Sequence, residues 1–490
     1  FAKSMDLSRR AIILIYGRAF SFFLSLLIPI VLSRLLLKED YGSYQQLIVI
    51  YTIVQAVLLL GMPQSLLYYF PRREPEEHPL LIRQTWTILL LSSLAVASLF
   101  WVGAEMMKTS LPGNHLQPFI FLLGIYTGIM ILVMPIQNLL IVEGNESLAM
   151  KSMIGFTLID ILVLPTAAWY NPTTLGIVHG ILGTAILKLI IVLGYVYTKY
   201  ISNKMVGTPY YMEQITYGIP VGLTAMIYVI NVNIDKYMVG LFFSSSVFAA
   251  YYLGSLWAPI FGWITQSVAQ VVTPRLSKYH KENNLEEMLN LYRNAIEKLF
   301  TLFFPATIFL AIIAEPLIIT LFTDNYSDAV PIFTIYLILL PTYAFNLGWI
   351  LMASRQTTFI LRLAAFAAIV NAILSYLLIT NLEGDNRLLA IPFATVSVTW
   401  ISTIVIMNKS VKTIDSKVSQ AFPWNHIGKV ILISIVCAAP IVGISLLDLA
   451  HLVELMISAV LFGILFIFLS LKAKIIGDDE IKLVKSFLPF

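Results

Sequence analysis

The sequence predicts an all-α polytopic membrane protein with about fourteen transmembrane helices. Three observations carry this prediction: the apolar composition, the long uncharged runs and the uneven placement of Lys and Arg. The chain has 490 residues, of which 59% are hydrophobic and 12% are charged. Soluble domains carry about 25% charged residues, and a soluble fold of this size has too little interior to hide so much apolar surface. Many apolar side chains must therefore face lipid.

Charged residues are confined to short blocks between long uncharged runs. These runs cover residues 41–71, 84–104, 109–142, 161–187, 237–274, 329–354, 363–382 and 388–408. About 20 apolar residues cross the hydrocarbon core, and open sheet edges cannot exist in lipid, so the spans should be helices. The predicted spans are 11–37, 44–69, 84–107, 117–142, 150–169, 173–198, 213–243, 247–273, 293–319, 329–353, 357–381, 387–408, 427–447 and 452–472.

The placement of Lys and Arg predicts the orientation. Fourteen spans put both termini on one side of the membrane, and that side collects 24 Lys and Arg residues whereas the other side collects four. Cytoplasmic loops carry the excess of positive charge, so we expect both termini in the cytoplasm. Removing one span would destroy this bias, so the span count and the charge bias support each other.

A weak internal repeat divides the chain. Residues 41–44 (YGSY), after the first span, resemble residues 248–251 (FAAY), after the seventh, and residues 70–72 (FPR) resemble residues 273–275 (TPR). Six spans separate the copies, which predicts a parallel repeat about an axis along the membrane normal. We therefore expect one six-helix lobe at 1–204, a second at 205–408, and two additional transmembrane helices with a cytoplasmic tail at 409–490.

The longest cytoplasmic connection, residues 274–298, has an amphipathic pattern. Asn284 followed by Glu287 is typical of an N-cap pair that opens a helix. Apolar residues then recur at helical spacing, at Leu285, Met288, Leu289, Tyr292 and Ile296. The pattern predicts a helix that lies on the inner leaflet, and a site for a regulatory partner is the alternative.

Several stretches resemble the polysaccharide-export flippase family, which handles O-antigen and capsule repeat units. Residues 29–44 (PIVLSRLLLKEDYGSY) are similar to the opening of these proteins, and residues 60–72 (LGMPQSLLYYFPR) continue the likeness. In the second lobe, residues 233–240 (NIDKYMVG) through 251–252 (YY) resemble the seventh and eighth helices of the family. The family belongs to the multidrug/oligosaccharidyl-lipid/polysaccharide transporter superfamily.

This resemblance implies a fold and a function. The implied fold has two six-helix bundles around a V-shaped central cavity. The implied function is translocation, by alternating access, of undecaprenyl-pyrophosphate-linked oligosaccharide repeat units across the bacterial inner membrane for surface polysaccharide synthesis. The implied partners are this lipid-linked oligosaccharide, the bilayer and the polysaccharide polymerase machinery, and no nucleic acid.

Five charged residues inside the predicted spans are candidates for the pathway, because intramembrane charge is costly and usually functional. Arg18, in the first span, is the candidate for binding the phosphates of the cargo. Asp160 would repel phosphate, so it is assigned to ion coupling or to structure, and Lys188 either serves the same role or extends to the interface. Adjacent Asp235 and Lys236 point about 100° apart and cannot simply pair. We assign Asp235 to gating and Lys236 to substrate binding, with a structural role as the alternative.

Uncharged amides form a second set of candidates for binding the sugars. Gln266 and Gln270 are four residues apart and share one face of the eighth span, and Gln64 and Asn231 are further candidates. Amides also hold neighbouring helices together in membranes, so a structural role is the alternative for each.

Nothing in the sequence predicts an enzyme. There is no Gly-rich phosphate loop, no nucleotide-binding domain and no cluster of metal ligands, and Cys437 is the single cysteine, so no disulfide or cofactor is expected. A membrane polysaccharide polymerase or ligase is the alternative from another class, but such enzymes usually carry a large periplasmic loop, and the predicted outer loops are short. A cation-coupled multidrug exporter and a lipid II flippase are the alternatives within the superfamily.

Overall fold

The structure, a computed structural model, is helical and has no strand in the part of the chain that it describes. Twelve helices are long and apolar enough to cross a membrane, and a bent helix pair raises this number to thirteen. The chain is therefore a multi-pass membrane protein, as the composition predicts. The described residues are 14, 16–110, 115–201, 206–256, 258–345, 348–384, 386–447 and 449–475.

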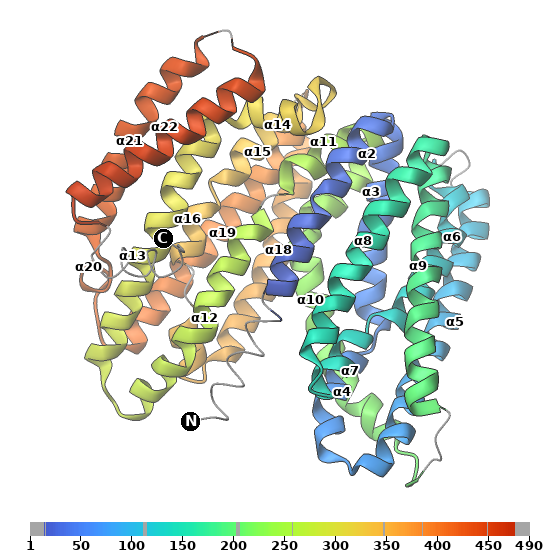
Figure 1. The fold of residues 1–490 in the computed structure, drawn as a ribbon. Helices are drawn as coiled ribbons and strands as arrows, with labels where there is room; N and C mark the ends of the chain where they lie inside the picture. Colours follow the sequence, from blue (N-terminus) through green and yellow to red (C-terminus); the bar gives the residue numbers. More distant parts are fainter. Residues whose placement is uncertain are drawn as a thin grey trace. The chain divides into compact units, whose positions relative to one another are not determined.

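The helices form two compact units, at 1–249 and 250–490 (Figure 1). The first unit opens with a span at Tyr16–Leu35, whose second part is α2 (Leu27–Leu35). It continues with α3 (Lys38–Leu58), α4 (Met62–Tyr69), η1 (Phe70–Arg72), η2 (Pro75–Glu77), α5 (His78–Ser110), α6 (Gln117–Val133), α7 (Ile136–Val142), α8 (Glu146–Tyr170), α9 (Thr174–Val196), the π-helical turn η3 (Tyr197–Ile201), α10 (Tyr211–Phe242) and the start of α11 (Ser245–Ser255).

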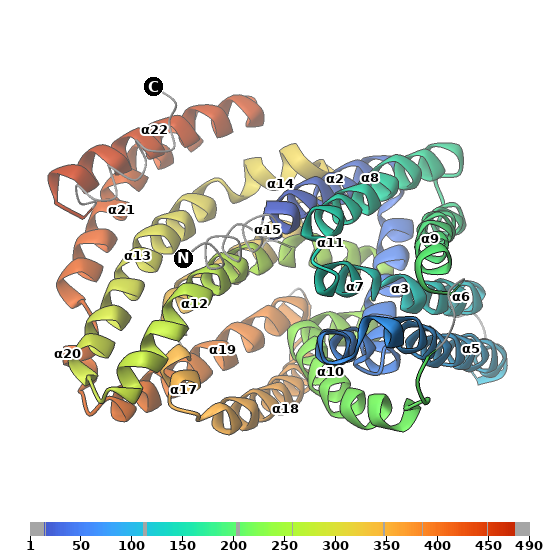
Figure 2. The same cartoon turned by 60° about the horizontal axis from the view of Figure 1, so that its bottom comes forward.

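The second unit contains the rest of α11 and the helices that follow. These are α12 (Ala258–Lys281), α13 (Leu285–Ile312), α14 (Ala314–Phe322), η4 (Asp324–Tyr326), α15 (Ala329–Leu337), α16 (Leu340–Phe345), α17 (Trp349–Ala353), α18 (Thr357–Asn381), α19 (Asn386–Thr413), α20 (Val418–Ala421), α21 (Trp424–Ser445) and α22 (His451–Lys472). Here α18 packs along α19, while α21 packs against both α13 and α22 (Figure 2). The predicted tail after residue 475 lies outside the described residues.

Two predicted spans are interrupted, which accounts for the difference from fourteen. The second span is the pair α3 and α4, bent by 41° at the break. The eighth, 247–273, extends over α11 and α12, and it is not among the twelve helices found within the described residues, which leave out Trp257 between the two. The other twelve predicted spans each correspond to one helical span that is long and apolar enough.

The backbone of α10 packs closely against the bend in the second span. Leu60 and Gly61 have positive φ angles of 52° and 65°, which end α3 and start α4 in a new direction. A Cβ on Gly61 would lie 2.2 Å from the carbonyl oxygen of Gly218, and a Cβ on Gly222 would lie 2.9 Å from the Gly61 nitrogen. Glycine thus permits both the left-handed backbone and the backbone-to-backbone contact between α4 and α10.

Gly61→Ala is expected to destabilise the protein by about 2 kcal/mol or more, because the new methyl group meets backbone and the left-handed conformation is strained for alanine. Gly155→Ala in α8 is the matched control, since nothing lies within 4 Å of its Cβ position. Alanine favours a helix interior over glycine, so the control should be neutral or slightly stabilised. Thermal unfolding in detergent measures both variants, and equal midpoints would contradict this packing.

The packing of α10 also bears on the division of the chain. The sequence repeat assigns this helix to the second lobe, 205–408, whereas in the structure α10 packs on α3 and α4 and belongs to the compact unit 1–249. A division of the chain by compactness and a division by an internal sequence repeat need not place a boundary at the same residue. The arrangement as two six-helix lobes around a cavity therefore stays a prediction.

The amphipathic connection is a correction to the sequence analysis. Asn284 does cap a helix, since its side-chain oxygen accepts a hydrogen bond from the Glu287 backbone N–H at 3.2 Å. However, that helix is α13, which runs on without a break to Ile312, so a separate helix on the inner leaflet is wrong. Met288 and Tyr292 are buried, and the Tyr292 ring packs edge-on against Phe422 at 6.1 Å. The apolar face is therefore covered by protein.

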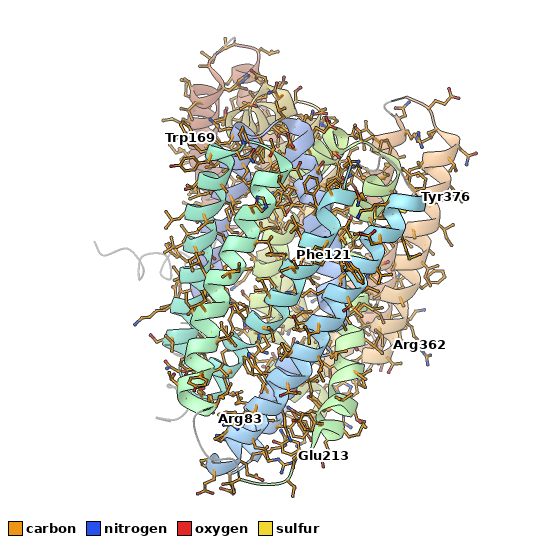
Figure 3. All side chains as sticks on the ribbon, turned by 90° about the vertical axis from the view of Figure 1, so that its right-hand side faces the viewer. Arg83, Phe121, Trp169, Glu213, Arg362 and Tyr376 are labelled. Atoms are coloured by element: carbon orange, nitrogen blue, oxygen red, sulfur yellow. The ribbon has the colours of Figure 1, made fainter. Side chains whose placement is uncertain are left out.

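Three labelled residues mark the two ends of the first unit. Arg83 and Glu213 lie at one end, which we call the inner end because the sequence predicts it to be cytoplasmic, and Trp169 lies at the other, the outer end (Figure 3). In the second unit, Arg362 and Tyr376 lie toward opposite ends of α18 (Figure 3).

Candidate functional site

A buried ion pair lies inside the first unit, between α8 and α9. The Lys188 Nζ is 2.6 Å and 2.7 Å from the two carboxylate oxygens of Asp160, and the two side chains are 6% and 26% exposed. The helices that present them are both N-capped by side chains, α8 by Asn145 and α9 by Thr173. Both carboxylate oxygens are bonded to the ammonium, which compensates a charge that would otherwise be costly at this depth.

Polar aromatic residues surround this pair. Tyr51 on α3 and Tyr126 on α6 have ring centroids 4.8 Å apart, and both interact electrostatically with Asp160. Gln55 lies one turn after Tyr51, is buried and interacts with the Tyr51 side chain. The interior of this unit is therefore polar along α3, α6, α8 and α9.

Arg18 is the predicted phosphate-binding cation of the first span. Its neighbour Gly17 is buried, and a Cβ there would lie 2.5 Å from the Met150 side chain, so this part of the span packs on α8. The Arg18 side chain is exposed, and no hydrogen bond or ion pair joins it to another described residue. Arg18 is thus an exposed cation close to the start of the first described span, Tyr16–Leu35.

Three predicted residues share the second half of α10. Asp235 is buried and engaged in an interaction with its surroundings, whereas Asn231 and Lys236 are half-buried. Lys236 forms no ion pair with any described residue. The structure thus places the anion of this adjacent pair in the interior and leaves the cation partly accessible.

The remaining amide candidates are dispersed. Gln266 and Gln270 are both exposed on one face of α12 in the second unit, and Gln64 on α4 in the first unit is half-buried. Of all the predicted site residues, the structure brings Asp160 and Lys188 together from different helices.

Glu143, which the sequence analysis did not single out, has a side chain that is only 5% exposed. Its carboxylate accepts hydrogen bonds from the hydroxyls of Tyr195 and Tyr200 and from the Lys199 ammonium. Tyr195 and Lys199 are four residues apart, but Tyr200 joins them because η3 is a π-helical turn. A 3.6-residue period does not predict this convergence.

A second group that the sequence analysis missed ties α4 to α10 at the inner end. Tyr68 stacks on Tyr217 with centroids 4.5 Å apart, and Arg73 lies 3.5 Å from the Glu213 carboxylate. The Arg73 guanidinium also covers the Tyr210 ring at 4.0 Å, and burial raises the pKa of Tyr210 to about 12. These contacts and the glycine packing near Gly61 hold the first half of α10 in place.

Comparison with solved structures defines the class of fold. The chain is similar to the lipid II flippase MurJ in an inward closed conformation, with a TM-score of 0.71, 17% identity and coverage of 94% of this chain and 99% of that one. It is also similar to an inward-facing multidrug resistance MATE family transporter (TM-score 0.64, 14% identity, 81% and 94% covered). A MOP superfamily transporter from Pyrococcus furiosus is similar with a TM-score of 0.57 and 14% identity, and the match covers 84% of this chain and 95% of that one. At these identities the likeness shows the fold alone, which this chain shares with these transporters.

The sequence defines the family within this class. The chain belongs to the polysaccharide biosynthesis protein family, whose model matches residues 31–331. A search of the curated proteins finds no match. This family and the proteins that share its fold are flippases and transporters rather than enzymes, which agrees with the sequence analysis.

Proposed function

We propose that this chain flips undecaprenyl-pyrophosphate-linked oligosaccharide repeat units across the bacterial inner membrane by alternating access. The observation that carries the proposal is the family match over residues 31–331, on a fold similar to that of a lipid flippase. The product would emerge on the outer leaflet, where polysaccharide polymerase machinery would consume it.

The polar residues of the spans support the proposal that the cargo is a lipid-linked oligosaccharide. A diphosphate and its sugars must pass about 30 Å of hydrocarbon, so they need cations and hydrogen-bond donors along the way. Arg18 is exposed, and its planar guanidinium can bond two phosphate oxygens at once. Lys236 would add a second cation, and the exposed amides of Gln266 and Gln270 suit hydroxyl groups. Gln64 and Asn231 would complete the binding set.

Ion coupling is the proposed role of the buried pair. Protonation of Asp160, or binding of another cation to the Asp160 carboxylate in place of the Lys188 ammonium, would release Lys188 and change the charge inside the first unit. Two states of one buried pair provide the kind of bistable element that a transport cycle requires. Asp235, buried on α10, is proposed to act in gating toward the outer side.

Depletion of the protein tests this function in cells. Lipid-linked oligosaccharide should then accumulate on the cytoplasmic leaflet, so membrane-impermeant periodate should oxidise its sugars in inside-out vesicles and not in spheroplasts. Cells that express the protein should show oxidation in spheroplasts. Equal oxidation in spheroplasts with and without the protein would exclude it as the main route for this cargo.

The proposed orientation places both termini in the cytoplasm, which follows from the charge bias. The structure offers two exposed positions that the bias puts on opposite sides, Glu383 and Ser419. In a Cys437→Ser background, an impermeant maleimide applied to intact spheroplasts should label Glu383→Cys. Ser419→Cys should react only after the membrane is permeabilised. The reverse pattern would invert the topology and leave the fold unchanged.

A further inference from the structure

Three exposed cations gather where α18 begins and α19 ends. The Gln356 side-chain nitrogen donates a hydrogen bond to the Thr413 hydroxyl at 3.0 Å, and this bond joins the two helix ends. Arg355 comes directly before Gln356, and Lys412 comes directly before Thr413, while Lys409 lies one turn earlier on α19. Arg355, Lys409 and Lys412 are all exposed. We call these three residues the basic corner of the second unit.

The cations of the basic corner have no acidic partner. No ion pair joins any of the three to an acid in the part of the chain that the structure describes. The Lys409 Nζ lies 5.8 Å from the centre of the Phe359 ring, and the nearby Asp415 is exposed and forms no ion pair with a described residue. Basic residues near other helix ends do have acidic partners, as in the pairs Arg73–Glu213, Lys199–Glu143 and Lys278–Glu282. The basic corner therefore presents uncompensated positive charge.

The basic corner lies at the boundary of two membrane spans. The spans are Thr357–Asn381 and Asn386–Thr413, so Arg355 lies two residues before the first, and Lys409 and Lys412 lie within the last five residues of the second. With 28 residues, α19 is about 42 Å long, whereas the hydrocarbon core is about 30 Å thick. The end of α19 therefore extends to the level of the lipid headgroups.

The face of α19 that carries the two lysines continues into apolar side chains. Ile401, Val405, Lys409 and Lys412 follow one another at helical spacing, so they share one face. Ile401 is 61% exposed and Val405 is 36% exposed. The face thus presents cations at the helix end and apolar groups one to three turns deeper. A phospholipid has its groups in the same order, with a phosphate above acyl chains, whereas a soluble phosphate or an acidic peptide would leave the apolar part uncovered.

We propose that the basic corner binds an anionic phospholipid of the leaflet that the sequence predicts to be cytoplasmic. The headgroup phosphate lies among Arg355, Lys409 and Lys412, and an acyl chain lies along Ile401 and Val405. An arginine can bond two phosphate oxygens at once, while the two ammonium groups add charge. This proposal does not depend on which cargo the protein moves.

Thermal unfolding of the purified full-length protein in an uncharged detergent tests the binding. Short-chain phosphatidylglycerol should raise the unfolding midpoint in a saturable way, because a ligand that binds only the folded state stabilises it. Phosphatidylcholine with the same chains carries no net charge and should have little effect. Glycerol phosphate, which has the phosphate but no acyl chain, should also have little effect over the same concentrations.

A pair of double variants locates the site. Lys409→Gln/Lys412→Gln should raise the apparent Kd for phosphatidylglycerol about 25-fold, since each cation near an anionic lipid contributes about fivefold. Lys278→Gln/Lys281→Gln on α12 is the matched control, because it also removes two exposed lysines from the second unit. Its apparent Kd should change by less than about threefold. All four side chains are exposed, so both proteins should fold.

An unfolding midpoint that does not respond to phosphatidylglycerol in the parent would overturn the proposal. An equal loss in the two double variants would do the same, because it would show a general effect of net charge. A glycerol phosphate response as large as that of the lipid would assign a soluble phosphate instead. Arg18→Ala should keep the full response, and its loss there would mean that the lipid occupies the proposed cargo site, so this proposal and the proposed function fail separately.

Discussion

Replacing Arg18 with alanine is expected to lower the rate of cargo flipping by about 100-fold while the protein still folds. A charge-assisted, bidentate contact to phosphate contributes about 2 to 3 kcal/mol, and each 1.4 kcal/mol is a factor of ten. Arg18 is exposed and has no polar partner among the described residues, so its removal leaves no other group unpaired. Flipping should fall because the cargo loses its anchor, and thermal stability should be unchanged or slightly higher.

Arg362→Ala on α18 is the matched control, because Arg362 is also an exposed arginine on a membrane-spanning helix. Arg362 is not part of the proposed binding set, so little change in flipping is expected. Arg18→Lys should restore part of the rate, since an ammonium keeps the charge but cannot form the planar fork. Full flipping by Arg18→Ala would remove this residue from the mechanism.

Replacing Lys188 with methionine should destabilise the protein by about 3 to 5 kcal/mol, because it leaves the Asp160 carboxylate inside the first unit without its cation. Asp160→Asn should be destabilising for the same reason, since it leaves the 95%-buried Lys188 unpaired. Thermal unfolding of the purified variants in detergent measures both effects. If either single variant unfolds at the midpoint of the parent, the pair is not the compensated buried pair that its geometry indicates.

The double variant Lys188→Met/Asp160→Asn separates structure from transport. Removing both charges at once should recover most of the lost stability, because an uncharged pair of similar volume needs no compensation. If the pair couples transport to an ion, the stable double variant should flip cargo at a rate that no longer responds to a proton or sodium gradient. A double variant that keeps the gradient response would leave the pair with a structural role.

The membrane spans could be predicted from sequence because the bilayer sets a length and a polarity that local composition reports. The breaks within spans could not. The run 44–69 is uncharged throughout, and the bend at Gly61 depends on the close approach of Gly218, which is 157 residues away. The same limit explains the error over residues 285–296, because a buried amphipathic face and a face that rests on lipid have the same sequence pattern.

The candidate site was predictable residue by residue but not as a geometry. Asp160 and Lys188 are unusual because they are charged residues within membrane spans. Their separation of 28 residues does not predict that they pair, because the pair forms only where α8 and α9 pack side by side. Tyr200 joins Glu143 only through the π-helical turn η3, which has no pattern in the sequence.

Reconstitution of the purified protein tests the proposed flippase function most directly. Undecaprenyl-pyrophosphate-linked oligosaccharide, labelled in its sugars, is placed in both leaflets of proteoliposomes, and impermeant periodate then oxidises whatever is exposed outside. With the parent protein, oxidation should continue beyond the outer-leaflet half toward completion, and with Arg18→Ala it should stop near half on the same timescale. A parent protein that behaves like empty liposomes with this cargo, while moving a cationic drug, would contradict the proposed function and establish a multidrug exporter instead.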